Sequence, residues 1–272
     1  MEKKFPKNTF SKRLGSMLSV DARRMFGTPL FYIMLGIAVV VPILILVMTT
    51  MMDGSVSVDP NTGKETVMEA FDSAWQIIGT VSSSGESANA GAASMDMMSM
   101  CNINLLYFGA AVLIALFVSA DFKSGYSKNL FTVRAIKNDY ILSKTIVGFI
   151  AAAILVVGFF LGTVVGGSIA GLPFTMDGFT SANLVMCMLT KVLLMAVFVP
   201  IYVMASVIGK QKTWLCMVLS LAVGMLLFSM IPMISPINAT AMNVILCLAG
   251  GVLFSLGFGA VSKTILQKRD IL

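Results

Sequence analysis

Histidine is absent from this 272-residue sequence, and charged residues are scarce. Lys, Arg, Asp and Glu together make up 12% of the chain, against roughly 25% in a typical soluble domain. The lack of histidine removes the commonest general base and the commonest metal ligand. The four cysteines form no C-x-x-C pair and lie in or beside apolar runs, so we interpret them as small core residues. We therefore expect no metal site and no catalytic residue on this chain.

Motifs that would supply energy for chemistry or transport are also missing. The phosphate-binding pattern G-x-x-x-x-G-K-[ST] does not occur, because residues 209–213 resemble it but lack the first glycine at the required spacing. Asp and Glu are absent from the interiors of the long apolar runs, which disfavours a proton-coupled carrier with a carboxylate relay. We therefore expect no cofactor on this chain, with any ATP and Mg²⁺ bound by a separate partner.

What the sequence does contain is six long apolar runs, and apolar residues make up 57% of the chain. At about 1.5 Å per residue, each run is long enough to cross a hydrocarbon core about 30 Å thick. The predicted fold class is therefore an all-α integral membrane protein with six transmembrane helices. The predicted spans are residues 30–52, 103–120, 140–171, 184–208, 213–234 and 240–262.

The positive charges are distributed very unevenly about these runs. Threading the chain through six spans puts all but two of the 19 Lys and Arg residues on one side; the exceptions are Lys64, in the opposite loop, and Lys191, inside a span. Short loops rich in Lys and Arg stay in the cytoplasm, so both termini are predicted to be cytoplasmic and the loop 53–102 extracellular. Basic residues at span ends meet anionic lipid, so the net charge of +6 does not indicate nucleic-acid binding.

Two segments outside the spans have helical periodicity. Residues 10–27 place apolar side chains near one face and most basic side chains on the other, which predicts a helix lying in the membrane interface. A short solvated helix is the alternative. Residues 65–79 predict a second short helix, within the extracellular loop, with Trp75 on its apolar face.

Three glycines and one lysine stand out within the spans. Gly158, Gly162 and Gly166 recur every four residues, so they share one helix face and predict close packing against a helix that the sequence does not identify. Lys191 lies roughly 10 Å from the outer end of its span. Its side chain would either snorkel to the outer surface or face a central cavity and contact a polar or anionic part of a substrate.

The predicted cytoplasmic loop 121–139 has the features of a docking element. Ser127 can cap a short helix over residues 128–135, which would lie across the inner surface between two membrane helices. Such a helix offers apolar anchors and a charge that fixes register; an ordinary basic loop is the alternative. The residues that we predict to couple it to a partner are Ser127, Lys128, Leu130, Phe131 and Arg134.

The same loop resembles that of a known family. Residues 121–130, followed by Arg134 and by Ser143-Lys144, are similar to the inner-loop pattern of ABC-2 type permeases: an acidic–aromatic pair, then Gly, Lys-Asn-Leu, Arg and Ser-Lys. The last six residues, the basic N-terminal helix and the six-span layout are similar to that family as well. Ser127 departs from the pattern, since many members have Thr or another residue there. The outer loop is also longer than in the smallest members, which leaves the cargo open.

The resemblance implies a permease that pairs with a second copy of itself and with two copies of a separate ATP-binding subunit. It would reside in a bacterial plasma membrane, with both termini cytoplasmic, and export its cargo by alternating access. The nearly uncharged spans favour a hydrophobic or amphipathic cargo, and the small size is most similar to that of bacteriocin and toxin-peptide exporters. Drug, lipid or sodium efflux by the same architecture and a non-transporting membrane sensor or scaffold are the alternatives.

Overall fold

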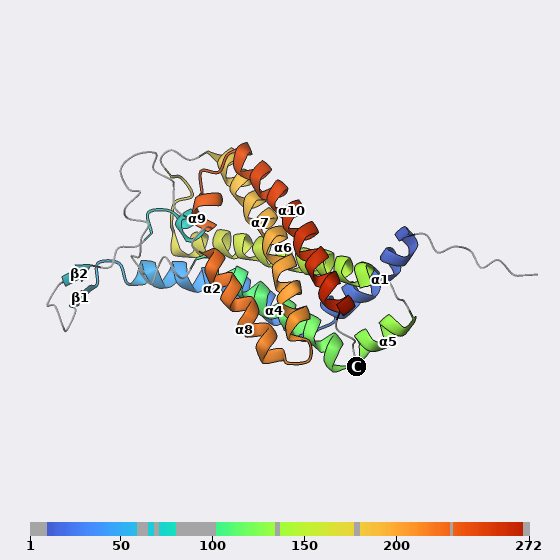
Figure 1. The fold of residues 1–272 in the computed structure, drawn as a ribbon. Helices are drawn as coiled ribbons and strands as arrows, with labels where there is room; N and C mark the ends of the chain where they lie inside the picture. Colours follow the sequence, from blue (N-terminus) through green and yellow to red (C-terminus); the bar gives the residue numbers. More distant parts are fainter. Residues whose placement is uncertain are drawn as a thin grey trace, which may run out of the picture.

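A computed structural model describes residues 10–58, 65–67, 71–79, 102–133, 137–176, 180–228 and 231–268 (Figure 1). Nearly all of the described chain is helical, which confirms the predicted all-α fold class. The helices and strands are α1 (Phe10–Phe26), α2 (Pro29–Met51), β1 (Val56–Val58), β2 (Glu65–Val67), the 3₁₀ turn η1 (Ala74–Ile77), α4 (Leu105–Lys123), α5 (Tyr126–Val133), α6 (Lys137–Ala170), α7 (Ser181–Gly209), α8 (Thr213–Phe228), α9 (Ile231–Ile234) and α10 (Ala241–Lys268).

Five of these helices are long and apolar enough to cross a membrane: α2, α4, α6, α7 and α10. The region predicted as the fifth span, 213–234, instead contains the 16-residue α8 and the single turn α9. At about 1.5 Å per residue α8 is about 24 Å long, which is short for a hydrocarbon core of about 30 Å. The number of spans is therefore five by length and composition, and the sixth stays a prediction.

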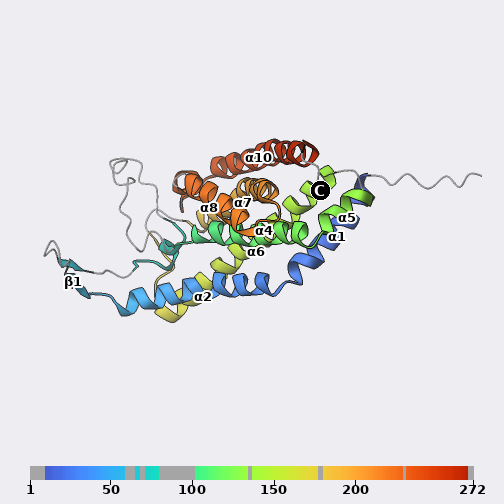
Figure 2. The same cartoon turned by 60° about the horizontal axis from the view of Figure 1, so that its bottom comes forward.

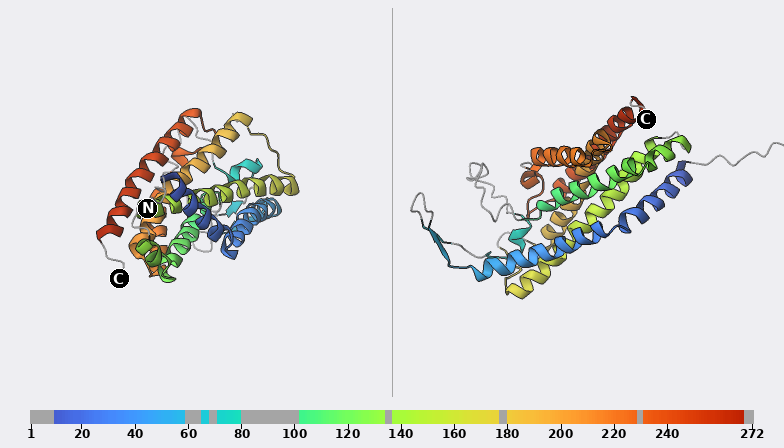
Figure 3. Two further views of the ribbon diagram at one scale, coloured as in Figure 1. Left: turned by 90° about the vertical axis from the view of Figure 1, so that its right-hand side faces the viewer. Right: turned by 90° about the horizontal axis from the view of Figure 1, so that it is seen from below.

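The bundle has two distinct ends. We call the end that carries α1, α5 and the C-terminal end of α10 the basic end, and the end that carries β1, β2 and η1 the hairpin end (Figures 1 and 3). Because α1 and the last turn of α10 lie at the same end, α8 and α9 together must return the chain to the hairpin end before α10 begins. The even number of passes expected from the charge pattern stays a prediction, because five of the described helices reach the length of a span and α8 does not.

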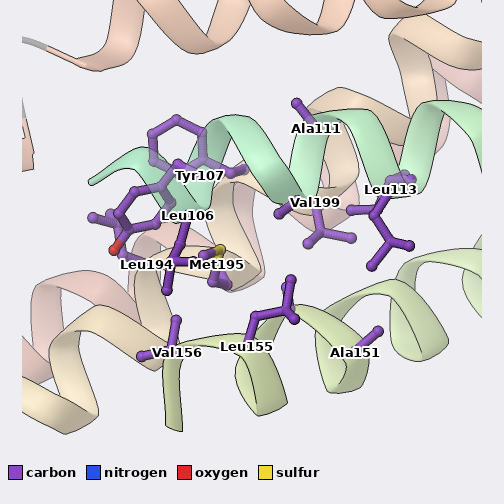
Figure 4. Close-up of a cluster of buried hydrophobic side chains, with 14 of the residues drawn as sticks. Leu106, Tyr107, Ala111, Leu113, Ala151, Leu155, Val156, Leu194, Met195 and Val199 are labelled. Atoms are coloured by element: carbon purple, nitrogen blue, oxygen red, sulfur yellow. The ribbon is translucent and has the colours of Figure 1, made fainter. Parts of the chain in front are cut away.

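The apolar core lies where α4, α6 and α7 meet (Figure 4). Tyr107 from α4 is 1% exposed, and its ring lies 4.8 Å from that of Phe198 of α7. Leu155 of α6 and Met195 of α7 are fully buried in the same cluster. These three helices are thus held by packing within one chain, whereas the outward faces of α2 and α10 carry many exposed apolar side chains, as lipid-facing helices do.

The helix that packs on the glycine face of α6 is α2. A Cβ at Gly158 would come 2.9 Å from Leu35, one at Gly162 would lie 2.7 Å from Cγ of Pro42, and one at Gly166 would lie 2.8 Å from Cα of Ile43. Gly162 and Gly166 therefore allow the α2 backbone to approach α6 closely, and Gly158 makes room for side chains of α2. The two helices contact each other over several turns and cross in the view of Figure 2.

The prediction of a short helix over residues 65–79 is wrong. Glu65–Val67 pairs with Val56–Val58 as an antiparallel hairpin, and only Ala74–Ile77 forms a single 3₁₀ turn. That turn is anchored by contacts far apart in sequence, since the Trp75 indole N–H donates to the carbonyl of Phe174 at 3.0 Å. Tertiary contacts rather than local periodicity decide the structure of this segment.

Candidate functional site

A cluster of buried charges joins three helices at the basic end. The ammonium of Lys144 on α6 lies 2.8 Å from the carboxylate of Asp21 on α1 and 2.6 Å from that of Asp121 on α4. All three side chains are fully buried. Charges without solvent are costly unless they are paired and hydrogen-bonded, so this geometry fixes the position of α1 against the membrane helices.

Polar and aromatic neighbours make further contacts with the two carboxylates and the ammonium of this cluster. The hydroxyl of Ser143 donates to Asp21 at 2.6 Å, and that of Tyr140 donates to Asp121 at 3.1 Å. The Lys144 ammonium also lies 3.8 Å from the centroid of the Phe117 ring, a cation–π distance. We refer to Asp21, Asp121, Tyr140, Ser143 and Lys144 as the charge cluster.

Arg24 brings a second cation to the cluster and balances its two carboxylates. Its guanidinium lies 2.6 Å from Asp121 and stacks over the ring of Tyr126 at 4.2 Å. Burial raises the pKa of the Tyr126 phenol, and the nearby carboxylates of Asp21 and Asp121 raise it further. With two anions and two cations the group is neutral overall, and its ion pairs join α1, α4 and α6. Among the residues that the structure describes, no group of three His, Cys, Asp or Glu side chains could hold a metal ion.

The short helix α5 directly contacts this cluster. Gly125 makes the turn from α4 into α5 with φ of +72°, a conformation that glycine adopts without strain. Ser127 does not cap the helix as predicted, because α5 begins one residue earlier, at Tyr126. Its buried hydroxyl instead donates to the carbonyl of Asp121 at 3.3 Å. The α5 backbone is therefore tied to a residue of the charge cluster.

The predicted coupling residues divide into two groups on α5. Leu130 and Phe131 pack in part against the core of this chain, and the Phe131 ring meets that of Tyr140 edge-on at 5.3 Å. Lys128 is exposed to solvent, as are Asn129 and Thr132. Arg134 lies outside the described residues. The exposed side chains described on α5 are thus more polar than the sequence suggested, while Phe131 packs α5 on α6.

Lys191 is deeply buried in α7, with 1% of its side chain exposed. Its ammonium donates to the amide oxygen of Asn104, at the hairpin end of α4, over 3.4 Å. Its backbone carbonyl accepts the Tyr107 hydroxyl at 3.2 Å. Lys191 therefore points toward the hairpin end through protein rather than lipid, and its contact with substrate stays a prediction.

Sequence reasoning missed the charge cluster as a structural unit. Asp121, Ser143 and Lys144 attracted notice only as parts of a family-like pattern, and Asp21 attracted none. The available signal was one acidic residue, Asp21, on an otherwise basic amphipathic helix. In the structure this position of α1 is completely buried. That signal is weak by itself, because an exposed Asp21 would suit an interfacial helix equally well.

Comparison with known proteins identifies the family of this chain. The family model described as ABC-2 family transporter protein matches residues 28–227, from the start of α2 almost to the end of α8. The match includes α5 and four of the five residues of the charge cluster. No curated protein and no solved structure matches the chain significantly. The chain therefore belongs to the ABC-2 family of transporter proteins, which are multi-pass membrane subunits that work with a separate ATP-binding subunit.

Proposed function

We propose that this chain is the permease half of an ATP-driven exporter of amphipathic or hydrophobic cargo, with peptide as the cargo class. Two copies would pair with two ATP-binding subunits, and the basic end would face the cytoplasm of a bacterial cell. Cargo would leave by alternating access, as the membrane helices change position under the influence of nucleotide on the partner.

The observation that carries this proposal is the connection between α5 and the charge cluster. The short helix lies between the ends of α4 and α6, Ser127 ties it to the carbonyl of Asp121, and Phe131 packs on Tyr140. A displacement of α5 by a partner would therefore move α4, α6 and α1 together. A solvated loop with no buried contacts would absorb the same displacement.

The distribution of charge supports the orientation. The described basic residues of α1, α5 and the ends of α4, α6 and α10 gather at one end, and positive loops remain in the cytoplasm. The nature of the cargo is supported by the spans, whose interiors contain no Asp or Glu and are rich in Met and aromatic residues. Such surfaces suit apolar or amphipathic molecules better than strongly charged ones.

The proposal is tested by reconstituting the chain with its ATP-binding subunit in lipid vesicles and measuring ATP hydrolysis. We expect the two proteins to co-purify and hydrolysis to rise when an amphipathic peptide is added. The matched control replaces that peptide with one of the same composition in scrambled order, which has no apolar face.

Each other result points elsewhere. Stimulation by a drug, a lipid or sodium, without stimulation by peptide, would move the cargo to that class while leaving the architecture intact. Failure of any ATP-binding subunit to associate would contradict the transporter function and favour a sensor or scaffold.

A further inference from the structure

A cavity of about 290 Å³ lies between the elbow that joins α1 to α2 and the inner half of α4. One wall comes from the elbow, where Arg24 and Thr28 are polar and Met25 and Leu30 are apolar. The Thr28 hydroxyl is already used, since it donates to the carbonyls of Arg24 and Met25. Arg24 is therefore the polar group on this wall that can serve a ligand.

The opposite wall is a stripe of α4. Leu113, Leu116, Phe117 and Ala120 line the cavity, at the spacing of one helix face. One turn further, the same face reaches Lys123, which is exposed at the basic end. The cavity is thus apolar along the helix and positively charged where the helix meets water.

At the end of the cavity nearest the basic end, the positive charge exceeds the negative charge that the described residues supply. Arg24 is paired with Asp121 on one side, but a guanidinium has five N–H donors, so others remain for a second partner. Arg23, next to Arg24 on α1, and Lys123, one turn beyond Ala120 on α4, are exposed and form no ion pair with any residue that the structure describes. An anionic group in the cavity would therefore meet Arg24 in the lining, with two further cations close in sequence to lining residues.

We infer that this cavity binds an anionic phospholipid of the inner leaflet, with its phosphate group at Arg24 and Lys123 and the start of an acyl chain along Leu113, Leu116 and Phe117. The inference rests on the proposed function in one respect, because the cavity meets the inner leaflet only if the basic end faces the cytoplasm. Basic pockets between membrane helices on that side attract anionic head groups.

Size and position favour a lipid over other occupants. The cavity volume of about 290 Å³ is at the lower end of the roughly 300–1,000 Å³ of small-ligand sites, so a two-chain phospholipid would place its head group and the start of one chain there, with the remainder in the bilayer. A second copy of the chain would bring its own exposed Arg23 and Lys123 to a surface that is already positive. Because Arg24 also pairs with Asp121 of the charge cluster, a bound lipid would stabilise the elbow in the arrangement that the cluster requires.

The test uses the full chain in vesicles that contain equal amounts of phosphatidylglycerol and phosphatidylethanolamine, followed by extraction in mild detergent and native mass spectrometry. We expect retained lipid to be enriched in phosphatidylglycerol. Ala120→Phe, which fills the cavity from an exposed position, and Lys123→Gln, which removes a cation near the cavity, should each reduce that enrichment several-fold. Ala260→Phe and Lys12→Gln are matched controls at exposed positions outside the cavity and should leave it unchanged.

Three results would overturn the inference. The first is equal retention of the two lipids by the unaltered chain, and the second is an equal loss of phosphatidylglycerol enrichment in the control variants. The third is loss of the dimer in Ala120→Phe with lipid retention unchanged, which would assign the cavity to a contact between copies. Binding of the ATP-binding subunit is measured on the same preparations. If the unaltered chain keeps its partner but retains the two lipids equally, only the lipid site is contradicted, whereas a missing partner contradicts the proposed function.

Discussion

At the scale of single residues, the charge cluster shows how a membrane protein tolerates ions in its interior. Lys144 is fully buried but lies within 2.8 Å of two carboxylates, so its charge is compensated on both sides. Lys191 is equally buried, yet among the described residues its ammonium has an amide oxygen, at 3.4 Å, as its hydrogen-bond partner. The two lysines therefore differ in their expected response to the same substitution.

Lys144→Met should destabilise the protein strongly. It leaves the carboxylates of Asp21 and Asp121 buried with too little positive charge, and removing one partner of a buried ion pair costs about 3–5 kcal/mol. Thermal unfolding in detergent measures the effect. Lys128→Met, at an exposed position of α5, is the control and should change the midpoint little. Equal midpoints for both variants would show that the cluster contributes nothing to stability.

Lys191→Met should behave in the opposite way. A methionine of similar length removes a buried charge that has only one neutral partner, so the free energy of unfolding should stay the same or increase. If Lys191 contacts cargo in another conformation, the stimulation of ATP hydrolysis by peptide should fall. A lower unfolding temperature would mean that its bond to Asn104 is worth more than its burial costs.

At the scale of elements, close approach of α2 depends on the glycine face of α6, while the proposed coupling to a partner depends on α5. The α2 backbone lies against Gly162 and Gly166, and α2 side chains lie against Gly158. The contacts of α5 divide between packing on this chain, through Phe131, and an exposed polar face that includes Lys128.

Gly162→Leu should separate α2 from α6 and lower stability. A side chain there would collide with the carbonyl of Val39 and with Pro42, and overpacking costs about 1–3 kcal/mol. Gly257→Leu on α10 is the matched control, because nothing lies within 4 Å of a Cβ at that position. Unfolding temperatures in detergent compare the two variants. Similar temperatures would contradict the claim that this face needs glycine.

Phe131→Ala combined with Arg134→Ala should weaken binding of the ATP-binding subunit without preventing membrane insertion. Since the Phe131 ring also packs on Tyr140, a modest loss of thermal stability should accompany the weaker binding. Co-purification yield and membrane fractionation measure the two effects separately. Unchanged co-purification would contradict the proposal that the ATP-binding subunit docks on α5.

At the scale of the whole molecule, the orientation in the membrane is the property on which transport direction depends. In a variant without native cysteines, Ser55→Cys at the hairpin end should react with a membrane-impermeant thiol reagent in intact cells. Ser11→Cys on α1 should react only after the cells are permeabilised, because it lies at the basic end. The reverse pattern of labelling would invert the proposed topology and contradict the inner-leaflet lipid site.

Much of this architecture could be predicted from local patterns. Length and hydropathy predict the long helices because a bilayer requires about 20 apolar residues for each crossing, and charge predicts which ends gather together. The spacing of Gly158, Gly162 and Gly166 predicts a close helix contact for a similar reason, since four residues return to one helix face.

The amino-acid sequence by itself therefore determined the all-helical membrane fold, the uneven charge and the place of the short helix α5. Only the tertiary structure decided that α2 covers the glycines, that Asp21 pairs with Lys144 across 123 positions of the chain, and that residues 65–67 form a strand. The physical reason is the range of the forces involved. Burial in lipid and helix periodicity act over neighbouring residues, whereas a buried ion pair exists only after distant helices have excluded water from between its charges.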